Sequence, residues 1–128
     1  MTAVYSNIET DFRSEEDVLY YRDSLFSGTF KSQKEDVLEE KQYQNGLRHG
    51  IQKIFFQKGN LKQATLFTNG LENGRRIEYY CCGAKKMNAS YTEGELDGTL
   101  EEWDDSGVLK VRKTYFKGKL IAVKSTFY

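Results

Sequence analysis

The chain has 128 residues, the size of one ordinary domain, and its 19 basic and 19 acidic side chains give a formal net charge of zero. This balance argues against a protein that grips nucleic acid through the phosphates, because such proteins carry a basic excess. No apolar run approaches the roughly 20 residues that span a bilayer, and the N-terminal stretch lacks the basic and apolar regions of a secretion signal. We therefore expect a cytoplasmic protein without stable membrane insertion.

Residues 1–20 precede the repetitive part of the chain and are expected to form an N-terminal cap. Ser14 and Asp17 resemble a helix capping box, so the segment "SEEDVLYY" could begin a short helix. It could equally form a strand, because the Val-Leu pair at residues 18–19 recurs twice farther along the chain. The strand is the preferred interpretation.

An internal repeat begins near Tyr21 and is the strongest signal in the sequence. A lead aromatic residue recurs every 24 residues, and ten of the eleven glycines follow it at fixed offsets. We divide the array into a degenerate copy at residues 21–42, complete copies at 43–66, 67–90 and 91–114, and a partial copy at 115–128. The repeated positions are Tyr43, Gly46, Gly50, Gly59, Phe67, Gly70, Gly74, Gly83, Tyr91, Gly94, Gly98, Gly107, Tyr115 and Gly118.

The runs between the glycines are typical of β-strands. They are short, rich in aromatic and β-branched residues, and bounded by Gly, Asn and Asp. The segments "QKGN", "CCGA" and "DSGV" indicate tight turns, so each repeat is expected to be one hairpin. One hairpin cannot bury its apolar face alone, whereas stacked neighbours can. We predict an all-β fold: an elongated, single, twisted antiparallel sheet of stacked hairpins, with about 24 residues per repeat.

Alternation along the strands predicts which side chains share a face. Twelve residues after the lead aromatics stand Phe55, Tyr79 and Trp103, which this alternation places on the same face as the lead aromatics. Aromatic ladders of this kind would stabilise the sheet. The residues expected on the opposite, solvated face are Lys62, Lys86, Lys110, Glu78 and Glu102.

The order of a lead aromatic, Asn-Gly, a second glycine and an aromatic strand resembles the MORN repeat. Segments such as "YQNGLRHGIQKIFFQKGNLKQATLF" and "FTNGLENGRRIEYYCCGAKKMNASY" are similar to the MORN-repeat variant (YwqK-type) of antitoxin and immunity proteins. Two departures lie at the edges of the array, where Ala122 replaces the second glycine and the first copy lacks Asn-Gly. The resemblance implies a long hairpin sheet and an immunity protein, which neutralises a cognate bacterial toxin by binding it.

Residues that often carry chemistry do not form a catalytic or metal-binding pattern in this chain. His49 takes a loop position that Asn73 and Asp97 occupy in later copies, which is typical of a polar turn residue. Cys81 and Cys82 have no second pair at metal-ligand spacing, and we interpret them as two small residues leading into a turn. We therefore expect no enzyme activity, no metal and no cofactor.

Aromatic and acidic side chains near the "CCGA" and "DSGV" turns are the best candidates for a partner site, because exposed aromatic patches often mark one. The acidic run from Glu93 to Gly107 could meet a basic toxin surface, or it could be a solvated strand and turn. The candidate residues are Phe55, Phe56, Tyr79, Tyr80, Trp103, Glu101, Glu102, Asp104 and Asp105.

Two further functions remain possible at this point. The chain could be a non-catalytic MORN-type scaffold or a membrane-associated interaction module, although its balanced lysines and glutamates do not favour a membrane surface. The apolar final segment "KLIAVKSTFY" could also serve as an edge strand for self-association or for docking a toxin.

Overall fold

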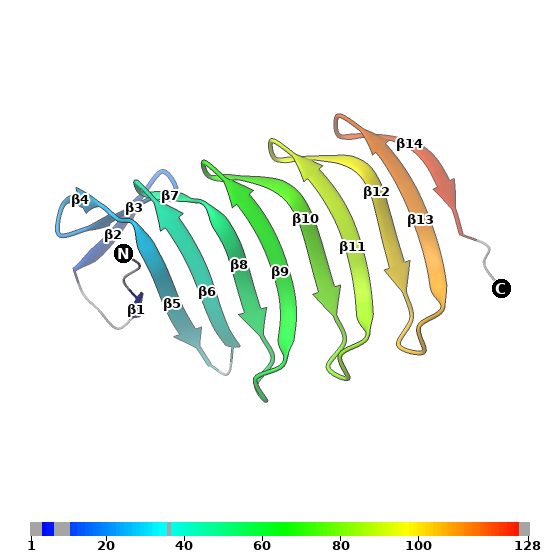
Figure 1. The fold of residues 1–128 in the computed structure, drawn as a ribbon, viewed down its shortest axis with the longest axis horizontal. Helices are drawn as coiled ribbons and strands as arrows, with labels where there is room; N and C mark the ends of the chain where they lie inside the picture. Colours follow the sequence, from blue (N-terminus) through cyan, green and yellow to red (C-terminus); the bar gives the residue numbers. More distant parts are fainter. Residues whose placement is uncertain (1–3, 7–10, 36, 126–128) are drawn as a thin grey trace.

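The computed structural model describes residues 4–6, 11–35 and 37–125, and all of the regular secondary structure in these ranges is β-strand (Figure 1). The strands are β1 (Val4–Ser6), β2 (Phe12–Glu15), β3 (Val18–Tyr21), β4 (Ser24–Leu25), β5 (Gly28–Lys34), β6 (Val37–Gln44), β7 (Leu47–Arg48), β8 (Gly50–Phe55), β9 (Leu61–Thr68), β10 (Leu71–Tyr79), β11 (Lys85–Thr92), β12 (Glu95–Trp103), β13 (Leu109–Phe116) and β14 (Lys119–Lys124).

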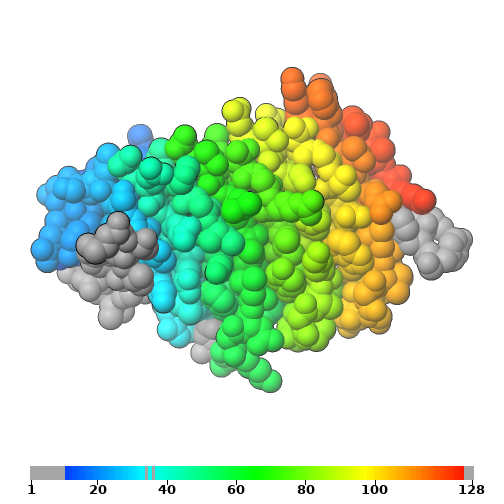
Figure 2. All heavy atoms as spheres, in the orientation of Figure 1, coloured from blue at the N-terminus to red at the C-terminus, as the bar shows by residue number. Residues whose placement is uncertain are grey.

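Most of these strands form one long sheet. It has eleven strands in the order β1-β5-β6-β8-β9-β10-β11-β12-β13-β14, with β7 paired to β6. From β5 onward all neighbours are antiparallel and follow one another along the chain, which confirms the predicted stack of hairpins. In Figure 2 the successive hairpins form bands from the N-terminal to the C-terminal end of the molecule.

The prediction of a single, purely antiparallel sheet is wrong in two respects. Strand β1 pairs with β5 in parallel, and β2, β3 and β4 form a second sheet of three strands. The proposed boundary after residue 20 falls inside β3. The preference for a strand over a helix in "SEEDVLYY" is confirmed: Glu16 and Asp17 form the turn between β2 and β3, at φ values of 49° and 66°. Two successive positive φ values are those of a tight hairpin turn.

The small sheet packs against the start of the long sheet through aromatic side chains. The ring of Phe12 lies 4.8 Å from that of Phe30 and 5.2 Å from that of Phe26, and the rings of Phe26 and Tyr43 are 6.0 Å apart. Phe26 is only 4 % exposed and Leu19 only 7 %, so the most buried large apolar side chains of the described chain lie here. This end of the molecule therefore has a two-layer core.

Backbone hydrogen bonds join the two sheets at Gly46. The Leu19 N–H donates to the Gly46 carbonyl at 2.8 Å, and the Gly46 N–H donates to the Phe26 carbonyl at 2.8 Å. A Cβ atom at Gly46 would come within 2.7 Å of Val18 and 2.9 Å of Leu25. The glycine is needed for this close approach as well as for its φ of 83°.

The hairpins of the array close through equivalent turns. Phe56, Tyr80 and Asp104 each donate their N–H to the carbonyl four residues later, at 2.7, 2.8 and 2.9 Å. This confirms the predicted turns at "QKGN", "CCGA" and "DSGV". In each of these hairpins the register shifts beside the turn, as expected of a β-bulge that increases the local twist.

At the opposite end of the strands, a second set of loops links one hairpin to the next. The N–H groups of Gly70, Gly94 and Gly118 each donate at 2.8 Å to a carbonyl of the preceding loop. Side chains reinforce this connection. In each loop the residue before the glycine donates its backbone N–H to a polar side chain of the preceding loop. The acceptor side chains are Ser27, His49, Asn73 and Asp97, and the donors are Asn45, Asn69, Glu93 and Lys117.

The substitution of alanine for the second glycine changes the register of the last strand. In β12, Leu96 pairs with Tyr91, and the ladder then skips residues around Gly98, whose φ is 107°. In β14, Leu120 pairs with Tyr115, and Ala122 already pairs with Thr114. An L-residue rarely adopts the Gly98 conformation, so the bulge in β14 is one residue shorter.

The two faces of the array follow from its register, because residues paired across antiparallel strands point to the same side. Arg76 pairs with Thr65 on one neighbour and with Ala89 on the other. Phe67 and Tyr91 lie two positions along from these partners and therefore share their side. We name this side the lead-aromatic face; it carries Tyr43, Phe67, Tyr91 and Tyr115.

The second aromatic row lies on the other side of the sheet, so the predicted shared face is wrong. Phe67 pairs with Glu72 across a two-residue turn, and partners across such a turn are separated by an odd number of residues. Glu72, five residues after Phe67, shares the face of Phe67. Tyr79 lies seven residues after Glu72, an odd number, so its side chain points to the opposite face. We name this side the Trp103 face; its aromatic row is Phe55, Tyr79 and Trp103.

The predicted position of the solvated set opposite the lead aromatics is wrong as well, and Lys86 lines one hollow together with Glu78 and Glu102. Glu78 and Glu102 both pair with Met87 and belong to the lead-aromatic face. The three lysines occupy the positions that the ladder skips at the bulges, and they reach back toward the turns. These lysines are Lys62, Lys86 and Lys110.

Candidate interaction site

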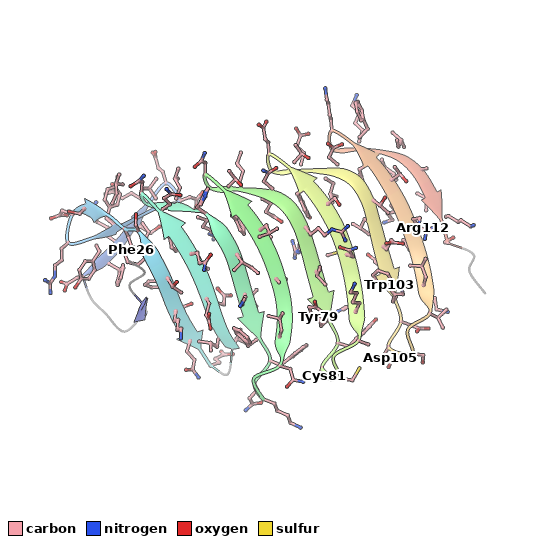
Figure 3. The ribbon with its side chains drawn as sticks, in the orientation of Figure 1. Phe26, Tyr79, Cys81, Trp103, Asp105 and Arg112 are labelled. Carbon is pink, nitrogen blue, oxygen red and sulfur yellow. The ribbon has the colours of Figure 1, made fainter. Side chains whose placement is uncertain are left out.

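The Trp103 face of β8 to β13 presents half-buried apolar side chains that no other described element covers. Phe55 pairs with Leu61 and Trp103 pairs with Leu109, so the aromatic row is extended by leucines. Ile51 and Ile77 lie farther along β8 and β10 on the same face. Figure 3 shows Tyr79 and Trp103 near the ends of β10 and β12, with Cys81 and Asp105 in the loops beyond them.

The structure does not bring the predicted partner residues together into one patch. Phe55, Tyr79 and Trp103 lie on the Trp103 face, whereas Glu102 lies on the lead-aromatic face. Phe56 and Tyr80 follow one position after the aromatic row and begin the turns. The candidate set therefore divides into a face and a row of turn residues.

The turn residues form a repeated contact with the lysines at the bulges. The Lys62 ammonium lies 5.7 Å from the Phe56 ring centre, and the Lys86 ammonium lies 5.7 Å from that of Tyr80. In the next copy Asp104 replaces the aromatic ring, and its Oδ2 atom lies 3.5 Å from the Lys110 ammonium. A cation meets a ring or a carboxylate in each copy, so these residues are held by local contacts.

Tyr80 additionally connects two hairpins. Its hydroxyl donates to the Trp103 carbonyl at 2.7 Å. Partial burial raises the pKa of this hydroxyl, and the nearby carboxylates of Asp105 and Asp104 add to the effect. Tyr80 therefore positions the backbone beneath Trp103 and is not a free contact residue.

The acidic run of β12 does not form a single negative surface. Asp104 accepts the N–H of Val108 at 3.0 Å and that of Ser106 at 2.9 Å. The hydrogen bond from Val108 lowers the pKa of Asp104, and the bond from Ser106 and the charge of Lys110 act in the same direction. Asp104 therefore stabilises its own turn.

Glu101 and Asp105 belong to the same run but have different surroundings. Glu101 accepts from Arg112 Nε at 3.1 Å and from Nη2 at 3.0 Å, so its charge is matched across β12 and β13. Asp105 is exposed in the loop beyond β12. Asp104 is thus bound within its turn, Glu101 is paired with Arg112, and Glu102 lies on the other face, so these carboxylates do not form one negative surface.

The lead-aromatic face carries a polar network instead of an open apolar strip. Arg76 Nη2 lies 3.2 Å from a Glu78 carboxylate oxygen and donates to Gln63 Oε1 at 3.3 Å. Gln63 in turn donates to Thr65, which is 2 % exposed. Ala89 is fully buried on the same face. This face is the more tightly packed of the two between β8 and β13.

A hollow of about 370 Å³ lies where the small sheet meets the lead-aromatic face. Phe12 and Phe30 line it together with the cationic side chains of Lys41 and Arg48. Tyr43 also lines it; burial raises the pKa of the Tyr43 hydroxyl, and the Arg48 guanidinium opposes that shift. Lys41 lies 3.5 Å from Glu39, so part of the positive charge in the hollow is neutralised.

His49, Cys81 and Cys82 take the structural positions that the sequence suggested. His49 Nδ1 accepts the Asn69 N–H at 3.4 Å in the loop connection described above. Both cysteines are free thiols and exposed in the turn after β10. In the described ranges, no group of three or more His, Cys, Asp or Glu side chains lies close enough to hold a metal ion.

Comparisons with known proteins add no relative to this picture. No family model matches the chain, and no curated protein matches its sequence at a significant level. The part of the chain that the structure describes contains no helix able to cross a membrane.

Sequence reasoning missed the separation of the two aromatic rows and the loop-to-loop side-chain bonds. The second feature had a signal: Ser27, His49, Asn73 and Asp97 occupy one repeat position, and all can accept a hydrogen bond. The first could have been found by counting residues across the Asn-Gly turn, because a two-residue hairpin fixes the pairing of its strands.

Proposed function

We propose that this protein is a cytoplasmic immunity protein, which acts without catalysis by binding and neutralising a cognate bacterial toxin. The equivalent turns and loop-to-loop hydrogen bonds at intervals of 24 residues support MORN-type repeats in the arrangement inferred from the sequence. The resemblance to MORN-variant antitoxins supports the immunity function. Repeat arrays typically use an extended surface to bind another protein.

The observation that carries this proposal is the Trp103 face. It aligns Phe55, Tyr79 and Trp103 on successive hairpins, half-buried and without cover from any described element. Rows of tyrosine and tryptophan are the usual anchors of protein interfaces, because they bury a large area at low cost in conformational entropy.

Genetic context and rescue of growth test the proposal. The product of a neighbouring gene should be toxic when expressed alone, and co-expression of this protein should restore growth. With Trp103→Ala, restoring growth should require at least tenfold more inducer of this protein. The reason is that truncating a central aromatic anchor costs about 2 kcal/mol or more of binding free energy. Tyr115→Ala, which removes a half-buried aromatic side chain from the other face, is the matched control.

The outcome also separates this function from a scaffold or membrane role. If no neighbouring gene product is toxic or binds the protein, the immunity function is refuted. Co-sedimentation with anionic vesicles that is lost at high salt would then favour a membrane-associated module.

A further inference from the structure

The Trp103 face carries cations that form no ion pair with any described residue. Lys53 lies on β8, Arg75 on β10 and Lys85 on β11, all on the side of Tyr79. None of these three forms an ion pair with another described residue. Free cations beside apolar side chains make this face positive although the whole chain is neutral.

The acidic side chains near this face do not cancel those cations. On β12, Glu101 is matched by the two donated bonds from Arg112. Glu40 on β6 pairs with Lys53 across the ladder, but the two side chains form no ion pair among those of the described residues. On the opposite side, by contrast, Arg76 lies between Glu72 and Glu78. Unmatched positive charge is thus a property of the Trp103 face.

The arrangement of the two kinds of side chain defines the chemistry of a partner. The aromatic row runs across the strands near one end of the face. Lys85 pairs with Tyr79 within the row, whereas Lys53 and Arg75 lie two residues before Phe55 on β8 and four residues before Tyr79 on β10. A segment that places apolar side chains on the row would bring the residues that flank them next to Lys85 in the row and toward Lys53 and Arg75 at its side. Acidic residues at those positions would gain charge complementarity, whereas basic ones would be repelled.

We propose that the Trp103 face docks an acidic segment of a partner protein, in which carboxylates flank large apolar side chains. The inference rests on the proposed function in that the toxin would supply this segment. The partner segment proposed for this face is negatively charged, whereas the acidic run that includes β12 had suggested a positively charged partner. A protein segment is favoured over nucleic acid, because only a few cations face this side and the chain has no basic excess.

Trp103 is the only tryptophan of the chain, so its fluorescence reports directly on this face. The probes are a short synthetic peptide in which Glu residues flank a central run of Leu (the Glu-Leu peptide), a matched peptide with Lys in place of Glu (the Lys-Leu peptide), and a third with Ser in place of Leu (the Glu-Ser peptide). The Glu-Leu peptide should change the Trp103 emission saturably, with a dissociation constant on the order of micromolar, as expected for a small interface. The Lys-Leu and Glu-Ser peptides should give at least tenfold weaker responses.

Variants locate the binding. Arg75→Glu should weaken binding of the Glu-Leu peptide about tenfold or more, because it turns an attraction into a repulsion. Lys113→Glu makes the same change of net charge on the lead-aromatic face, where Lys113 pairs with Leu100, and should alter binding less than threefold. Equal effects of the two variants would show that only net charge matters and would overturn the proposal.

Other outcomes are equally decisive. The proposal is wrong if the Glu-Leu peptide gives no saturable change, if the Glu-Ser peptide binds as well, or if a single-stranded oligothymidine binds more tightly than the Glu-Leu peptide. The peptide assay does not depend on toxicity. Peptide binding without rescue of growth would refute the immunity function alone, and full rescue by Arg75→Glu would refute the docking face alone.

Discussion

The two ends of this protein are stabilised in different ways. At the N-terminal end, a second sheet covers the first, and Phe26 and Leu19 are nearly inaccessible to solvent. At the C-terminal end, β13 and β14 form a single layer in which Phe116 is 57 % exposed and Ile121 is 63 % exposed. One end has an apolar core between layers, and the other depends on backbone ladders and loop connections.

This difference shows how an array with few buried apolar side chains can still be ordered. Apart from β7, each strand from β6 to β13 is paired on both sides, and each loop accepts a bond from the next. The faces of such a sheet need not be covered for the backbone to be satisfied. A thin sheet with a capped start can therefore leave the Trp103 face open to a partner.

The largest effect is expected in the two-layer core. Phe26→Ala should lower the free energy of unfolding by about 3–5 kcal/mol, because it removes a buried ring that contacts Phe12 and Tyr43. Phe116→Ala makes the same truncation at an exposed site and should cost less than about 1 kcal/mol. Urea unfolding of both variants measures the contrast, and equal losses would show that the small sheet adds no core.

A glycine pair separates close packing from backbone strain. Gly46→Ala should cost about 2–3 kcal/mol, because its Cβ would collide with Val18 and Leu25 and φ is positive. Gly83 also has a positive φ, but nothing lies within 4 Å of its added Cβ. Gly83→Ala should therefore cost only about 1 kcal/mol. Urea unfolding measures the loss of stability in both variants. A smaller loss for Gly46→Ala than for Gly83→Ala would contradict the packing of the cap.

The loop connection predicts a smaller effect at His49. His49→Ala leaves the Asn69 N–H without its side-chain acceptor and should destabilise the protein by about 1 kcal/mol. His49→Asn supplies the acceptor that Asn73 provides in the next copy and should change stability by less than about 0.5 kcal/mol. If both variants lose the same stability, the bond from Asn69 contributes nothing.

The smallest effect is a gain in the single-layer region. Lys117 adopts a φ of 48° in the turn before β14, a conformation that asparagine tolerates better than lysine. Lys117→Asn should stabilise the protein by about 0.5 kcal/mol. Lys119→Asn removes the same charge from a strand position and serves as the control. A melting temperature that rises only for Lys117→Asn supports the turn assignment; an equal rise in both would point to charge.

The sequence predicted the parts of this fold that depend on local conformation. The glycines marked the turns, and the 24-residue period correctly indicated hairpins that stack in chain order. The small sheet escaped prediction because it depends on contacts between distant residues such as Phe12 and Phe30. The arrangement of the candidate residues was predicted only in part: Phe55, Tyr79 and Trp103 do share a face, but their separation from the lead aromatics depends on strand register.

Residue-resolved amide hydrogen exchange of the free protein tests the central contrast most directly. If the first hairpin is held by a two-layer core and the last by a single layer, amides of β5 and β6 should exchange at least tenfold more slowly than those paired between β13 and β14. Protection that is uniform along the array, or highest between β13 and β14, would contradict a capped start followed by an open sheet.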